Sequence, residues 1–195
     1  GANVIKYETN LNNENISIVS TSTHDSSSGS GARTIIIKGI YIDTGDSNKF
    51  KSKITTWTMN GTSAVSSPTT GTNGFVVVNS MEFLSNGTHK LSNTGEITAQ
   101  FSAGNIVNLI QVETGQSHTA FYAVKTGKTL LIKELNITSL LQTACQIQLY
   151  ILSLDNGLRT LIDKISLNGD ENINHQLNLL VEENHIVFAD ILPLE

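Results

Sequence analysis

Runs in which apolar and polar residues alternate recur along the whole chain, and turns rich in Gly, Asn and Asp separate them. A two-residue period predicts β-strands with one buried face, and strands joined by such short turns are typical of antiparallel sandwiches. We therefore predict an all-β protein with an antiparallel, jelly-roll-like β-sandwich. The expected strands are 16–19, 34–42, 51–59, 75–83, 96–101, 105–112, 119–124, 129–138, 146–154, 158–167, 173–181 and 186–191.

The expected strands fall into two groups, which predicts an N-terminal β-sandwich half at 15–115 and a C-terminal, jelly-roll-like half at 116–195. Residues 1–14 are polar and Asn-rich, and we expect an extended N-terminal arm there. A chain of 195 residues is long enough for one large sandwich or for two small ones packed together.

The segment Ser117–Thr138 lies between these two groups of strands. Two runs rich in β-forming residues, Thr119–Val124 and Thr129–Thr138, flank the tetrapeptide Lys125–Lys128. Gly127 in this tetrapeptide suits the unusual backbone angles of a tight turn. The pattern predicts a β-hairpin. A helix over 128–142 is the alternative, although β-branched residues and the lack of a cap favour a strand.

The second strand of this predicted hairpin changes face part of the way along. Leu130 and Ile132 share one face, whereas Leu135 and Ile137 share the other. A phase change of this kind predicts a β-bulge near Lys133-Glu134.

Two strands of the N-terminal half differ in pattern. Thr34–Ile42 is apolar on both faces, which predicts a strand covered on both sides, at the centre of a sandwich or at an interface. Lys51–Met59 alternates, with Trp57 and Met59 on one face and threonines on the other. Between the first two strands, Ser20–Ala32 is rich in Ser and Gly, and we interpret it as a solvated linker rather than a contact loop.

The charge pattern argues against several classes of partner. The net charge is −5, and the 12 basic residues are scattered singly, so we predict no nucleic-acid binding. The sequence contains neither an apolar run of about 18 residues nor a basic-then-apolar leader, so we expect no membrane span and no signal peptide. Cys145 is the only cysteine, and we interpret it as a buried free thiol.

We predict no cofactor or resident metal. Thr126–Thr129 resembles the end of a phosphate-binding loop, but Tyr122 stands where that motif needs a glycine. The acidic turns around Asp43 with Asp46 and around Asp170 offer oxygen ligands for Ca²⁺, although neither matches a complete calcium loop and Asx turns explain both.

The chain carries no recognisable catalytic motif, and we predict that it is not an enzyme. The five histidines lie in separate segments at 24, 89, 118, 175 and 185. Glu182 and His185 form an E-x-x-H pair, but Asn184 between them indicates a turn rather than a metal-binding helix. The nucleophile signature that would surround a catalytic Ser or Cys is missing.

Four aromatic side chains are candidates for stacking against a sugar ring or another ligand. They are Trp57, Tyr41, Tyr122 and Tyr150. Since aromatic residues make up only 6% of the chain, the alternative is that they fill the space between sheets. Exposure of Trp57 would favour a stacking platform, and its burial would remove the leading candidate.

Three stretches resemble virion-associated proteins of aquatic tailed phages. GARTIII from Gly31 is followed by TMNGTSAV from Thr58, which is similar to the GARTV and TLNGTTAV elements of that group. FYAVKTGKTL from Phe121 resembles the group's FYTVPAGKTLYLT hairpin, with Lys125-Thr126 in place of Pro-Ala. The resemblance covers roughly 29–138. Uncharacterised β proteins of large algal DNA viruses are similar in character.

The resemblance implies a non-enzymatic, β-sandwich structural component of a virion, such as a minor capsid, decoration or fibre-associated module. It implies partners among other virion proteins or in further copies of the chain, as a homo-oligomer, and assembly in the cytoplasm of the host cell. It carries no catalytic residues. The alternative function is a carbohydrate- or receptor-binding module that recognises a host glycan or receptor, and an enzyme ranks third.

Overall fold

The computed structural model describes residues 13–47, 49–66, 74–88, 92–101, 104–117, 119–139 and 144–193. The regular secondary structure of these residues consists of β-strands, and all the strand pairings are antiparallel. The prediction of an all-β antiparallel fold is confirmed. The strands are β1 (Ile16–Ser20), β2 (Ala32–Asp43), β3 (Lys49–Thr58), β4 (Val65–Ser66), β5 (Val77–Asn86), β6 (Ile97–Phe101), β7 (Ile106–Ile110), β8 (Phe121–Ala123), β9 (Leu130–Ser139), β10 (Cys145–Ser153), β11 (Arg159–Leu167), β12 (Glu171–Val181) and β13 (His185–Pro193).

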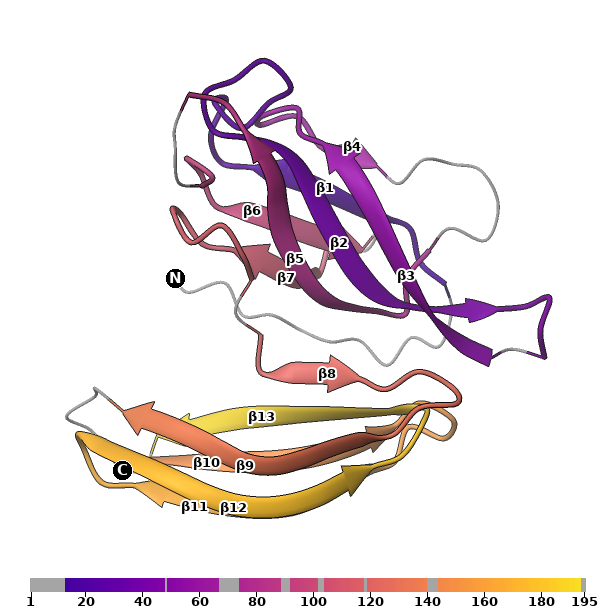
Figure 1. The fold of residues 1–195 in the computed structure, drawn as a ribbon, viewed down its shortest axis with the longest axis vertical. Coiled ribbons are helices and arrows are strands. Elements are labelled where there is room, and N and C mark those ends of the chain that lie inside the picture. The colour runs from indigo at the N-terminus through magenta and orange to yellow at the C-terminus, as the bar shows by residue number, and fades with distance from the viewer. Residues whose placement is uncertain are drawn as a thin grey trace. The chain divides into compact units, whose positions relative to one another are not determined.

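The chain divides into two compact units, Gly1–Thr119 and Ala120–Glu195. In the N-terminal unit, a four-stranded sheet of order β4-β1-β6-β7 and a three-stranded sheet of order β3-β2-β5 share one apolar core (Figure 1). β2 is the central strand of its sheet, with Ile35, Ile37 and Ile40 buried and Ile36 and Ile42 half-buried. One face of this strand is covered, whereas Ile36 and Ile42 on the other face are only half-buried, so the prediction that both faces are covered is confirmed only in part.

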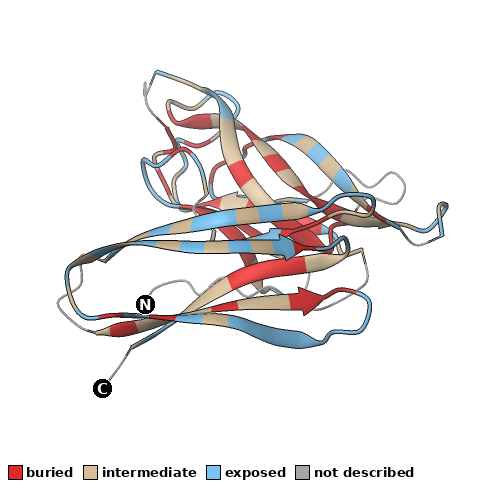
Figure 2. Ribbon diagram, turned by 60° about the horizontal axis from the view of Figure 1, so that its bottom comes forward, coloured by how far each residue is buried: buried red, intermediate tan, exposed pale blue. Residues whose placement is uncertain are grey.

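The C-terminal unit packs a four-stranded sheet of order β11-β10-β13-β8 against a two-stranded sheet of order β12-β9 (Figure 1). Side chains from both sheets fill the space between them, and burial alternates along the whole of β12 as the two-residue period requires. Figure 2 shows how buried and exposed residues are distributed over the strands. Both units are thus β-sandwiches, while the jelly-roll topology stays a prediction. The residues that line the interior of this unit include Leu149, Val181, Val187, Ile165, Leu167, Leu130, Ile132, Leu135, Ile137, Leu177 and Leu179.

The predicted hairpin at Ser117–Thr138 is wrong. β8 pairs with β13 in the four-stranded sheet, whereas β9 pairs with β12 in the two-stranded sheet. The turn at Lys125–Lys128 does form, with Gly127 at φ +77°, but it carries the chain from one sheet to the other. Local sequence signals a turn and leaves open which strand each flank will pair with. The helical alternative is also wrong, because 130–139 is a strand.

The strand pairing is irregular beside Lys133-Glu134, as predicted, but the extra residue belongs to the partner strand β12 rather than to β9. Two residues of β12, Leu177 and Asn178, lie opposite Lys133 alone, and Asn178 has φ +49°. Lys133 and Glu134 are both exposed, so the inward face of β9 changes at this point.

The interpretation of Ser20–Ala32 as a solvated linker is wrong, because the loop is packed around Asp25, whose exposed fraction is 0%. The Asp25 carboxylate accepts hydrogen bonds from Ser20 Oγ at 2.6 Å and from the backbone N–H of Ala32 at 2.8 Å and of Gly95 at 2.8 Å. A buried carboxylate is tolerated where several donors converge on it.

Glycine allows this close packing. A Cβ added at Gly31 would lie 2.1 Å from Asp25 Oδ1 and 2.8 Å from Thr94 Oγ1. The Ser and Gly composition that suggested a flexible linker therefore lets the loop backbone approach the carboxylate. Of the arm predicted at 1–14, residues 1–12 lie outside the described residues, while Asn13 bonds to the backbone of Ile42 through its side-chain amide.

Candidate functional site

Trp57 was the leading candidate for stacking against a ligand, and this prediction is wrong because the ring does not lie on the surface. Only 3% of its surface is exposed, and its ring packs in the apolar core of the N-terminal unit. Its Nε1–H donates to Thr55 Oγ1 at 2.7 Å, which satisfies the polar end of the ring. Tyr41 is half-buried, with Lys53 Nζ 5.8 Å from the ring centroid.

Tyr150 is covered by its neighbours. The Arg159 guanidinium lies 3.6 Å from the ring centroid, and Phe188 stacks on the ring at 5.3 Å. Tyr122 is 50% exposed, but it pairs with Val187 while Tyr150 pairs with Phe188. Because adjacent residues of a strand point to opposite faces, the two tyrosines lie on opposite faces of one sheet and cannot form a common platform.

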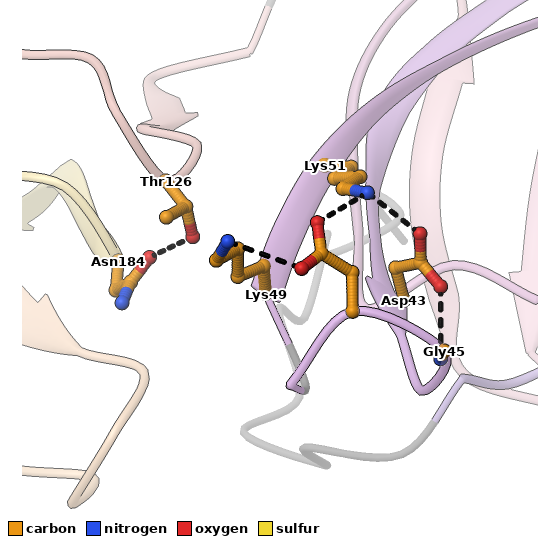
Figure 3. A network of polar contacts seen from close by, with 7 residues as sticks. Asp43, Gly45, Lys49, Lys51, Thr126 and Asn184 are labelled. Carbon is orange, nitrogen blue, oxygen red and sulfur yellow. Dashed lines mark hydrogen bonds and ion pairs between the residues drawn. The ribbon is translucent and has the colours of Figure 1, made fainter.

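The acidic turn between β2 and β3 is an ion-pair network (Figure 3). Lys51 Nζ lies 2.7 Å from Asp43 Oδ2 and 2.8 Å from Asp46 Oδ2, and Lys49 Nζ lies 3.1 Å from Asp46 Oδ1. Hydrogen bonds from Lys51 are the main cause that lowers the pKa of both carboxyls. Asp43 also accepts the Gly45 N–H at 3.0 Å, as in the expected Asx turn, so ammonium groups occupy the acceptors that a Ca²⁺ ion would use.

The turn after β8 is a second local network. Thr126 Oγ1 donates to Asn184 Oδ1 at 2.8 Å (Figure 3), and the Gly127 N–H donates to the Glu183 carboxylate. The backbone N–H of Val124 donates to the His185 carbonyl at 2.8 Å, and the backbone N–H of Asn184 donates to the Val124 carbonyl at 2.9 Å. The segment 126–129 therefore forms a structural turn rather than an open phosphate cradle.

The described histidines are not brought together. His175 Nε2 contacts Asp163 Oδ2 at 2.6 Å, His185 Nδ1 contacts the Glu183 carbonyl at 2.7 Å, and His24 is exposed. His89 and His118 lie outside the described residues. Cys145 is a buried free thiol, as expected. Within the described ranges, no three His, Cys, Asp or Glu side chains are grouped as metal ligands would be.

An exposed, hydrogen-bonded polar cluster lies on the outward face of the β12-β9 sheet. We define the amide surface as Glu134, Asn136, Asn174 and Gln176, all of which are exposed. Asn174 Nδ2 donates to Asn136 Oδ1 at 2.8 Å, and Gln176 Nε2 donates to Glu134 Oε2 at 2.9 Å and to Asn174 Oδ1 at 2.8 Å. The Gln176 hydrogen bond, followed by those of Asn174 and Asn136, lowers the pKa of Glu134, which favours the charged carboxylate.

Strict alternation in β12 creates this surface. Along 172–178, the Asn and Gln side chains face outward, and Ile173, His175 and Leu177 face inward. The strand register sets Asn174 opposite Asn136 and Gln176 opposite Glu134. The sequence reasoning missed this site, although the alternation of Asn and Gln with Ile and Leu in 172–180 was its signal. The arrangement offers amide donors, amide acceptors and one carboxylate, so it can hold a polar partner but supplies no nucleophile.

The chain matches no protein-family model, no curated protein and no solved structure. In the part of the chain that the structure describes, no helix is long and apolar enough to cross a membrane. Function is therefore inferred from the residues and their geometry.

Proposed function

We propose that this chain is a non-enzymatic structural protein that acts through protein–protein contacts, as a minor capsid, decoration or fibre-associated component of a virion. The observation that carries the proposal is the amide surface, an exposed and mutually hydrogen-bonded array held on a regular sheet. Preorganised donors and acceptors of this kind suit recognition by contact, because little side-chain freedom remains to be lost on binding.

The titratable groups of the two units support a structural role. Asp25 accepts hydrogen bonds from its own loop, His175 is paired with Asp163, and Lys51 bridges Asp43 and Asp46. Each of these interactions ties one segment of the fold to another. Such groups rigidify the sandwiches and hold their outer surfaces in place.

The virion context comes from the resemblance of 29–40, 58–65 and 121–130 to phage virion-associated proteins. In a particle, symmetry repeats each contact, so weak contacts add up to strong attachment through effective concentration. The partners are other virion proteins or further copies of this chain, assembled in the host cytoplasm. The net charge of −5 argues against nucleic acid as the partner.

The proposal is tested by raising an antiserum against the recombinant chain and labelling purified particles of the virus that encodes it. We expect regularly spaced labelling and, by quantitative mass spectrometry, a fixed number of many copies per particle. Labelling confined to infected-cell extract, with none on particles, would contradict a virion role.

A carbohydrate- or receptor-binding module is the second candidate, and the amide surface is the observation that favours it. Amide donors and a carboxylate acceptor match the hydroxyl groups of a glycan. Binding of the full chain to a glycan array, lost in the double variant Asn174→Ala with Gln176→Ala and kept in Asn156→Ala, would favour this function. Asn156 is a matched control because it is an exposed Asn on a different turn.

A further inference from the structure

One edge of the two-stranded sheet is open along a whole strand. β9 is 10 residues long and pairs with β12 on one side only. Among the described residues, no backbone hydrogen bond reaches its other side. An unpaired edge of this length presents a row of N–H and C=O groups to which another strand can add.

The burial pattern of β9 is the same when read in either direction. From Leu130 to Ile137, residues 130, 132, 135 and 137 are half-buried, and 131, 133, 134 and 136 are exposed. The change of face between Lys133 and Glu134 creates this symmetry. If two β9 strands pair antiparallel with Lys133 opposite Glu134, Leu130 meets Ile137 and Ile132 meets Leu135, so each inward side chain meets another inward side chain.

We infer that a second copy of this chain binds along the free edge of β9, antiparallel and related by a two-fold axis between Lys133 and Glu134. The axis sets Lys133 of each chain opposite Glu134 of the other and joins two β12-β9 sheets into one continuous four-stranded sheet. Charge complementarity selects a second copy as the occupant, because the same two residues supply both halves of both ion pairs. The inference rests on the proposed function and names its partner.

The two kinds of contact have different roles in this dimer. Backbone hydrogen bonds along the edge supply attraction in any register. The Lys133–Glu134 pairs fix the register, since a shift by one residue would turn inward side chains outward and would set Lys133 opposite Leu135. Glu134 is held as a charged acceptor by Gln176 and Asn174 at Oε2 and by Asn136 at Oε1, and Oε1 keeps an acceptor site for the Lys133 ammonium of the second copy.

The test uses the full chain in size-exclusion chromatography with light scattering over a wide concentration range. Wild type should form a dimer. Lys133→Glu and Glu134→Lys should each raise the dimer dissociation constant by roughly tenfold to a hundredfold, because each substitution sets two pairs of like charges opposite each other. An equimolar mixture of the two variants should restore the dimer as a heterodimer. That recovery also establishes that both variants are folded.

Two control variants isolate the edge. Lys164→Glu reverses an exposed charge on β11, and Asp170→Lys reverses an exposed charge on the turn before β12. Both should have a dimer dissociation constant within about twofold of that of wild type, because neither substitution changes an ion pair at the edge of β9. The inference is overturned if wild type stays monomeric, if its dimer tolerates both charge reversals, or if the mixture fails to associate. Each of these results leaves labelling of virus particles unaffected, so failure of this interface and failure of the virion role are distinguishable.

Discussion

His175 of β12 and Asp163 of β11 join the two sheets of the C-terminal unit, with 2.6 Å between Nε2 and Oδ2. A bulge in the β10–β11 pairing sets Asp163 opposite Leu149 and leaves Ile162 without an opposite residue. Asp163 lies two residues before buried Ile165 and opposite inward-facing Leu149, so regular alternation along β11 places it on the interior face, where it meets His175. One acidic residue in the inward row of β11 thus creates a polar link between two largely apolar faces.

Removing this link should loosen the C-terminal sandwich. Asp163→Ala should lower the free energy of unfolding by about 1 kcal/mol, because a partly exposed hydrogen bond to a charged group is lost. Urea unfolding of Asp163→Ala, His175→Ala and the double variant gives a coupling energy, which should be about 0.5 to 1 kcal/mol. Lys164→Ala, at the neighbouring exposed position, is the control. Additive effects of the two substitutions would mean that the contact contributes nothing to stability.

Replacing Asp25 should be far more costly than replacing an exposed Asp. Asp25→Ala leaves the N–H groups of Ala32, Thr94 and Gly95 without the carboxylate that accepts their hydrogen bonds. We expect a loss of about 3 kcal/mol or more in the free energy of unfolding. Thermal unfolding compared with exposed Asp170→Ala measures the difference. A loss below about 1 kcal/mol for Asp25→Ala would show that water replaces the carboxylate readily.

The hairpin-tip carboxyls of Asp43 and Asp46 should titrate below their ordinary pKa of 3.8, because Lys51 donates hydrogen bonds to both. Their folded pKa values lie below the unfolded ones, so their contribution to stability is present above the unfolded pKa and is lost as pH falls through the folded pKa. NMR titration of the side-chain carboxyl carbons measures both values. Lys51→Ala should move both pKa values back towards 3.8, and unchanged midpoints in this variant would contradict the network.

The sequence predicted strands well because each needs only local information. Alternation placed Trp57 and Met59 on a buried face, and both are buried. Strand partners were not predictable in the same way: the hairpin at 117–138 was wrong because β8 and β9 find partners more than 30 residues further along the chain. Pairing over such distances depends on the whole set of competing strands.

The two polar clusters were missed for a related reason. Asp25 lies in a stretch of Ser and Gly, and its burial depends on donors of Thr94 and Gly95, which lie 69 and 70 residues away. The amide surface needs Asn174 beside Asn136, 38 residues apart. In both cases the polar residues are ordinary surface types, and only the register of distant segments makes them a cluster.

Trp57 provides a direct optical test of the N-terminal core, because it is the only tryptophan in the chain. Its ring is 3% exposed, so its fluorescence should be blue-shifted and poorly quenched by acrylamide in the folded protein, and both properties should change on unfolding. Trp57→Ala should lower the free energy of unfolding by about 3 to 5 kcal/mol, since a large buried ring is removed. Tyr122→Ala, at a half-exposed ring, should cost much less. Ready quenching of the folded protein would mean that the ring is open to solvent and would return Trp57 to the list of ligand-stacking candidates.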